Sequence, residues 1–122
     1  MEMHAFHSRS KSETPRKFFL STPEGEVTEE YLLVLGYHSA TFVEARAGFR
    51  ERVVENASSK TPEKGFAEKH KSELLAKAVV DWSFVEPFSE SKVEEFLREC
   101  PHIAEDLDTF VYDRKSFFNG AV

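Results

Sequence analysis

The strongest constraint on the fold of this chain is a helical spacing of apolar residues in its C-terminal half, interrupted by two prolines. Apolar side chains recur at steps of three and four residues before Pro87, between Pro87 and Pro101, and again after Pro101. This spacing places them on one face of an α-helix, and proline ends a helix because it lacks an amide donor and its ring clashes with the preceding turn. The C-terminal half is therefore expected to form successive short amphipathic helices.

About four helices are expected in all, and each start carries residues typical of a helix N-terminus. In chain order these are Ser39, Thr61 with Pro62, Ser91 with Glu94, and the acidic first turn of a helix over 103–118. The second helix is expected to reach Trp82, because the apolar residues from Leu74 onward form one stripe. The last helix has the clearest pattern, with acidic side chains near its start and basic ones near its end, as the helix dipole favours.

The N-terminal part follows a different pattern. Residues 1–17 are serine-rich and slightly basic, and we expect a flexible arm there, followed by a single helical domain over 18–122. The apolar run at 18–20, with Pro23 and Gly25 after it, predicts a short β-hairpin. Residues 29–35 fit a buried strand or a short helix, and the acidic residues after Thr28 favour a helical turn. The expected fold is mainly α, with α+β character only at the N-terminal hairpin.

Charge and cysteine content bear on partners and compartment. The chain has 122 residues and a net charge of −6, so neither nucleic acid nor an anionic membrane is an expected partner. No apolar stretch approaches the roughly 20 residues that span a bilayer. A single cysteine, Cys100, excludes an intramolecular disulfide and is consistent with a reducing cytosol.

Residues that could support catalysis or bind a cofactor are few. The five glycines never cluster, which excludes a phosphate-binding loop. His4 and His7 lie on the expected flexible arm, without the paired ligands of a structural zinc site. Cys100 near His102 leaves a small Cys/His-dependent enzyme as an alternative, but a small buried side chain at the end of an apolar stripe is the favoured interpretation of this cysteine. We therefore expect no enzyme activity and assign no catalytic, cofactor-binding or metal-binding residue.

Aromatic residues are the better candidates for function. Phe84 and Phe88 flank Pro87, and Phe117 and Phe118 lie near the C-terminus. These four are the expected partner-binding residues, as exposed aromatic surface is typical of sites for a partner helix. Packing in the core is the competing interpretation, because aromatic residues at helical spacing are often buried.

One segment resembles a known family. Residues 73–84 read Glu-Leu-Leu-Ala-Lys-Ala-Val-Val-Asp-Trp-Ser-Phe, residues 87–97 form a Ser-led short helix, and Cys-Pro-His-Ile-Ala follows at 100–104. Together with the Asp- and Phe-rich stretch 106–118, this resembles the tail assembly chaperones of lambda-like, long-tailed bacteriophages. The resemblance covers about residues 66–118, extends weakly to 35–42, and does not include 1–17.

The resemblance implies a non-enzymatic role in virion morphogenesis. Such chaperones bind the long, aggregation-prone tape measure protein in the host bacterial cytoplasm, keep it soluble during tail assembly, and are absent from the mature virion. A programmed frameshift often adds an extension that is thought to recruit the tail tube protein, and this chain resembles the shorter, unshifted product. Several copies are expected to act on one client, so a homo-oligomer is implied. The alternative within the same setting is a minor tail or tail-completion protein that remains in the virion.

Overall fold

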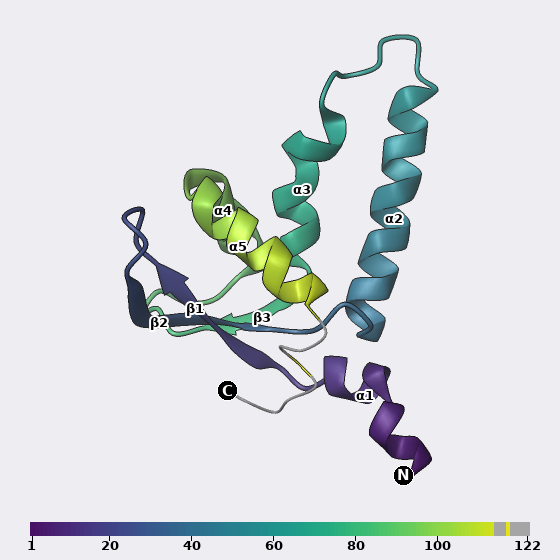
Figure 1. The fold of residues 1–122 in the computed structure, drawn as a ribbon. Helices are drawn as coiled ribbons and strands as arrows, with labels where there is room; N and C mark the ends of the chain where they lie inside the picture. The colour runs from purple at the N-terminus through teal and green to yellow at the C-terminus, as the bar shows by residue number, and fades with distance from the viewer. Residues whose placement is uncertain (114–116, 118–122) are drawn as a thin grey trace.

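In the computed structural model, which describes residues 1–113 and 117, helices pack against one face of a small antiparallel sheet (Figure 1). A 3₁₀ helix, η1 (Met3–Phe6), and α1 (Ser8–Ser12) precede strands β1 (Arg16–Ser21) and β2 (Val27–Val34). After α2 (Ala40–Ala57) and α3 (Phe66–Ala76) come β3 (Val79–Trp82), α4 (Glu90–Glu99) and α5 (Pro101–Tyr112). The fold is α+β, so the prediction of a mainly α fold with strands only in an N-terminal hairpin is wrong.

The sheet has the order β1-β2-β3, with every neighbouring pair antiparallel. The expected hairpin is confirmed: β1 and β2 pair across a turn in which Gly25, at φ +96°, donates its amide hydrogen bond to the Thr22 carbonyl at 2.8 Å. Residues 29–35 were expected to favour a helical turn, but 29–34 lie in β2. Thr28 does not cap a helix; its hydroxyl donates to the Leu20 carbonyl at 2.8 Å, which fixes the hairpin.

The third strand corrects the predicted second helix. That helix was expected to start at Thr61 and Pro62 and reach Trp82, but α3 begins after Gly65, which has a left-handed φ of +67°, and ends at Ala76. Residues 79–82 instead pair with β2, with a register irregularity between Leu33 and Val34. Pairing with β2 satisfies backbone groups that a longer helix would have bonded internally, and it widens the sheet that the helices cover.

The observed starts of the other helices agree only in part with those predicted from the sequence. Ser39 is confirmed as the N-cap of α2, where its side chain accepts a hydrogen bond from the Phe42 amide. The cap of α4 is Ser89 and not the expected Ser91, because the Ser89 hydroxyl accepts from the Lys92 amide. α5 begins at Pro101 and ends at Tyr112, because Asp113 has an extended backbone with ψ 103°, so the helix expected over 103–118 ends earlier than predicted. Residues 114–116 and 118 lie outside the described residues.

The core lies between the sheet and helices α3, α4 and α5. Phe18 and Leu32 point from the sheet toward Leu97 on α4 and Leu107 on α5, and all four are at least 92% buried. In Figure 1, α4 and α5 cross above the sheet, whereas α2 and α3 rise from it as an antiparallel pair joined by a loop at the far end. This arrangement leaves one side of α3 facing α2 and another facing α4 and α5.

The N-terminal residues 1–17, expected to be a flexible arm, carry η1, α1 and the first residues of β1. Ser12, at the end of α1, is 5% exposed, and its carbonyl accepts a hydrogen bond from the Gly36 amide at 2.8 Å. α1 therefore contacts the segment that connects β2 to α2.

Candidate functional site

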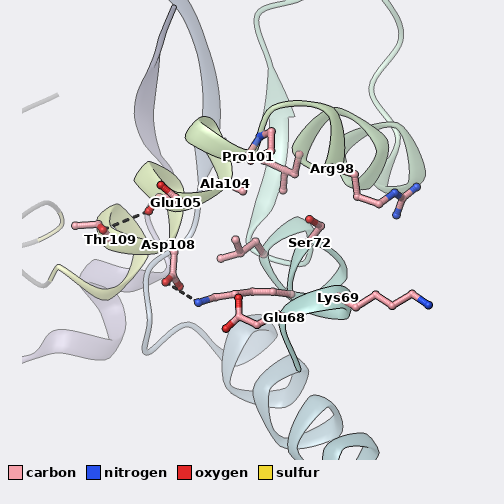
Figure 2. Close-up of a pocket in the computed structure, with 12 residues that line it drawn as sticks. Glu68, Lys69, Ser72, Arg98, Pro101, Ala104, Glu105, Asp108 and Thr109 are labelled. Atoms are coloured by element: carbon pink, nitrogen blue, oxygen red, sulfur yellow. Dashed lines mark hydrogen bonds and ion pairs between the residues drawn. The ribbon is translucent and has the colours of Figure 1, made fainter. Parts of the chain in front are cut away.

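A groove of about 500 Å³ opens between α3, α4 and α5 (Figure 2). Its lining comes from all three helices: Glu68, Lys69, Lys71, Ser72 and Leu75 from α3, Leu97 and Arg98 from α4, and Pro101, Ala104, Glu105, Asp108 and Thr109 from α5. Every one of these residues lies in the 66–118 segment that resembles tail assembly chaperones. The groove is thus built by the part of the chain that carries the resemblance.

The groove combines an apolar floor with a charged rim. Leu75 and Leu97 are 1% exposed and form part of the core beneath it, while Ala104 and Ser72 are half-buried and small. Small residues at these positions leave space between the helices that a larger side chain would fill. An apolar floor with polar edges is the surface that accepts the apolar face of an amphipathic helix.

The rim carries both signs of charge, and several of its ionic groups are already paired: Lys69 with Glu63, Arg98 with Glu94 and Lys71 with Asp108. In Figure 2, Lys69 and Arg98 extend at one end of the groove, while Glu105 and Asp108 lie at the other. Lys71 joins α3 to α5 through an ion pair with Asp108, with 2.8 Å between Nζ and Oδ2. This hydrogen bond raises the pKa of Lys71 above its ordinary value, so its ammonium group stays charged at neutral pH.

An ion-pair cluster joins α2 to α3 on the opposite side of α3. Arg52 Nη1 lies 2.8 Å from Glu73 Oε2, and His70 lies between Glu73 and Glu63, with Nδ1 3.1 Å from Glu73 Oε1 and Nε2 3.6 Å from Glu63 Oε2. The hydrogen bond with His70, followed by that from Arg52, lowers the pKa of Glu73. This cluster fixes α2 on α3 and leaves the groove side of α3 uncovered.

Two of the expected partner-binding residues belong to a half-buried aromatic cluster formed by Trp82, Phe84, Phe88 and Phe96. The Trp82 and Phe88 rings meet edge to face at 5.6 Å, as do those of Phe84 and Phe96 at 5.4 Å. The Trp82 indole donates to the Glu86 carbonyl at 2.8 Å, which closes the loop over the cluster. Phe84 and Phe88 therefore combine packing with partial exposure, and their role in partner binding stays a prediction.

The other two expected residues lie at the C-terminus. Phe117 is 2% exposed and packs on Phe110 with 5.4 Å between ring centroids, while Arg16 Nη2 donates to its carbonyl at 3.3 Å. Contact between the Phe117 ring and a partner would require the ring to leave this position. Phe118 lies outside the described residues.

Cys100 has the properties of a packing residue. It is half-buried between α4 and α5, and burial, with a smaller effect from Glu99, raises the pKa of its thiol. A nucleophilic cysteine needs the opposite shift, because the thiolate is the reactive form. The nearby His102 is engaged elsewhere, with Nε2 2.9 Å from the Ser21 carbonyl oxygen. This geometry does not favour the Cys/His-dependent enzyme.

Neither a metal-binding cluster nor a membrane-spanning helix is found among residues 1–113 and 117. Within them, no group of three or more His, Cys, Asp or Glu side chains is placed to hold a metal ion. None of the helices in the same residues has the length and apolar character needed to cross a membrane.

The groove was not predicted as a unit from the sequence. Ser72 and Ala104, two small residues that line it, come together only when the three helices have packed. Compared with protein-family models, with curated proteins and with solved structures, the chain matches none of them.

Proposed function

We propose that this chain is a tail assembly chaperone of a long-tailed bacteriophage, the shorter and unshifted product, which binds the tape measure protein and keeps it soluble in the host cytoplasm. The observation that carries the proposal is the three-helix groove, which lies entirely within the segment that resembles this chaperone family. The longer, frameshifted form would recruit the tail tube protein, and neither form would remain in the mature virion.

The physical role follows from the groove. A tape measure protein is long and helical, so it presents apolar helix faces that aggregate when exposed. The floor over Leu75 and Leu97 would cover such a face. The net charge of −6 also opposes nonspecific aggregation of the complex.

The test is co-expression with the tape measure protein encoded next to this gene, scoring how much of that client stays soluble and co-purifies. Ser72→Phe fills the groove without removing any core side chain, because Ser72 is half-buried on the groove wall. Ser59→Phe makes the same change at an exposed loop position outside the groove. Parent protein and Ser59→Phe should solubilise the client, whereas Ser72→Phe should lose most of this activity while remaining folded.

Each contrary outcome has a distinct meaning. If the client stays insoluble beside well-folded parent protein, the chaperone proposal fails and a tail protein retained in the virion becomes the better interpretation. If Ser72→Phe solubilises the client as well as the parent does, the groove is not the binding face. The aromatic cluster with Phe84 and Phe88 would then be tested next by replacing both residues with Ser.

A further inference from the structure

A second cavity, of about 370 Å³, is lined by residues of α2, α3 and the end of α5. Its volume lies in the range of pockets that hold small molecules. It shares Glu68 and Lys71 with the groove between α3, α4 and α5, and no other lining residue. Three cations and three aromatic rings dominate its lining: Arg46, Arg50, Lys71, Tyr37, Phe49 and Tyr112. We call this cavity the basic cleft.

Arg46 is fixed in the basic cleft and keeps most of its donors unused. Its guanidinium carbon lies 3.7 Å from the centroid of the Tyr37 ring, and Nη2 donates to the Tyr37 carbonyl at 3.0 Å. A guanidinium group carries five N–H donors, and within the described chain this one alone has an acceptor. The Nε atom is buried without a hydrogen-bond partner. The stacking on Tyr37 therefore holds the group in place while its terminal N–H groups stay available to an acceptor.

The basic cleft carries one positive charge in excess. Arg50, one turn after Arg46 on α2, is exposed and forms no ion pair within residues 1–113 and 117. Lys71 is paired with Asp108 at 2.8 Å, and Glu68 is the one carboxylate among the lining residues. Three cations thus face two carboxylates, in a chain whose net charge is −6. This local reversal of sign favours a singly charged anion over a dianion.

Aromatic side chains form the apolar walls of the basic cleft. The Tyr37 and Tyr112 rings meet with 4.7 Å between centroids at an angle of 55°, and Tyr112 is 45% exposed. Phe49 is half-buried and also lines the cavity. Such walls accept a planar ring through face and edge contacts. Apolar walls with a few fixed polar groups are typical of small-molecule sites.

We propose that the basic cleft binds a small aromatic monocarboxylate. The ring lies against Tyr37, Phe49 and Tyr112, and the carboxylate lies between Arg46 and Arg50. The two arginines are four residues apart, which places them on one side of α2. Guanidinium N–H groups match the geometry of a carboxylate and form strong, charge-assisted hydrogen bonds with it. This site is independent of the client-binding groove, and its occupation does not require the proposed chaperone function.

The first test is titration of the purified full chain with phenylacetate, followed in two-dimensional amide NMR spectra up to about 20 mM ligand. A ligand of about ten non-hydrogen atoms should bind with a Kd in the millimolar range. The amide signals of Tyr37, Arg46 and Arg50 should shift. Phenylacetamide, which has the same size but no charge, should bind at least about fivefold more weakly, because it forms no charge-assisted hydrogen bond.

Three outcomes of this titration overturn the proposal. The first is an absence of shifts up to about 20 mM phenylacetate, the range in which a millimolar site fills. The second is equal binding of phenylacetate and phenylacetamide, which would show that the cations do not select the ligand. The third is a set of shifts centred on Ala104 and Thr109, which line the groove and not the basic cleft.

A pair of variants tests the role of Arg50. Arg50→Gln removes the cation and keeps a long polar side chain at an exposed position, so the fold is retained. It should bind phenylacetate at least about fivefold more weakly and phenylacetamide as the parent does. Arg98→Gln makes the same change at an exposed position on α4, outside the basic cleft, and should match the parent for both ligands. Unchanged phenylacetate binding in Arg50→Gln, or an equal loss in Arg98→Gln, would show that Arg50 does not hold the carboxylate and would overturn the assignment.

Discussion

Gly36 is a position where one added methyl group should separate α1 from the rest of the molecule. Its amide donates to the Ser12 carbonyl at 2.8 Å, and the His38 amide donates to the Ser12 hydroxyl at 3.3 Å. A Cβ atom at Gly36 would lie 2.7 Å from Ser12 Oγ and 3.0 Å from Ser12 Cα. The last contact involves backbone, so a change of rotamer at Ser12 cannot relieve it. Gly36→Ala must therefore displace the end of α1.

The expected cost follows from that displacement. Overpacking a buried contact costs about 1–3 kcal/mol, and each kcal/mol lowers the melting temperature by about 4 °C for a chain of this size. Gly48→Ala is the matched control, since Gly48 lies inside α2 and an added Cβ there meets no atom within 4 Å. Alanine is a better helix former than glycine, so this control should be more stable than the parent by about 0.5–1 kcal/mol.

Urea unfolding of the parent and both variants measures the change in the free energy of unfolding caused by each substitution. The unfolding midpoints can be compared when the denaturant slopes are the same. We expect the two Gly→Ala changes to have opposite signs. If Gly36→Ala were as stable as the parent or more stable, the packing of α1 against Gly36 would be wrong, because alanine in an unpacked segment stabilises by restricting the unfolded chain. Residues 1–15, the part of the expected arm over 1–17 that precedes β1, would then be flexible as the sequence predicts.

Two further predictions concern ionisable groups. The hydrogen bond with His70 lowers the pKa of Glu73 below 4.5, so its stabilising effect is present at neutral pH and is lost as pH falls through the folded-state value. Between about pH 5 and pH 3, the melting temperature of Glu73→Gln should therefore fall less than that of the parent protein. An equal fall in the two melting temperatures would contradict a stabilising role for the Glu73 carboxylate. Burial raises the pKa of the Cys100 thiol, so its reaction with a disulfide reagent at neutral pH should be slower in the folded than in the urea-unfolded chain. Equal rates would restore the case for a reactive cysteine.

The sequence predicted correctly those features that depend only on residues close together in the chain. Ser39 caps α2 because its side chain reaches an amide three residues ahead, and Gly25 allows the hairpin turn because of its left-handed backbone. The start of α4 was harder to place. Ser89 and Ser91 are both good caps by residue type, and the choice depends on which serine has an extended backbone, a property that residue type does not fix.

The third strand could not be predicted because its partner is distant in the chain. The apolar spacing from Leu74 through Ala78 to Trp82 is helical, and it continues without interruption across the end of α3. These residues leave the helix because β2, about 45 to 50 positions earlier in the chain, offers its backbone groups for pairing. A strand of four residues is too short to reveal its own alternation, so its tertiary partner decides its structure. The groove was missed for the same reason, since it exists only when three helices have packed.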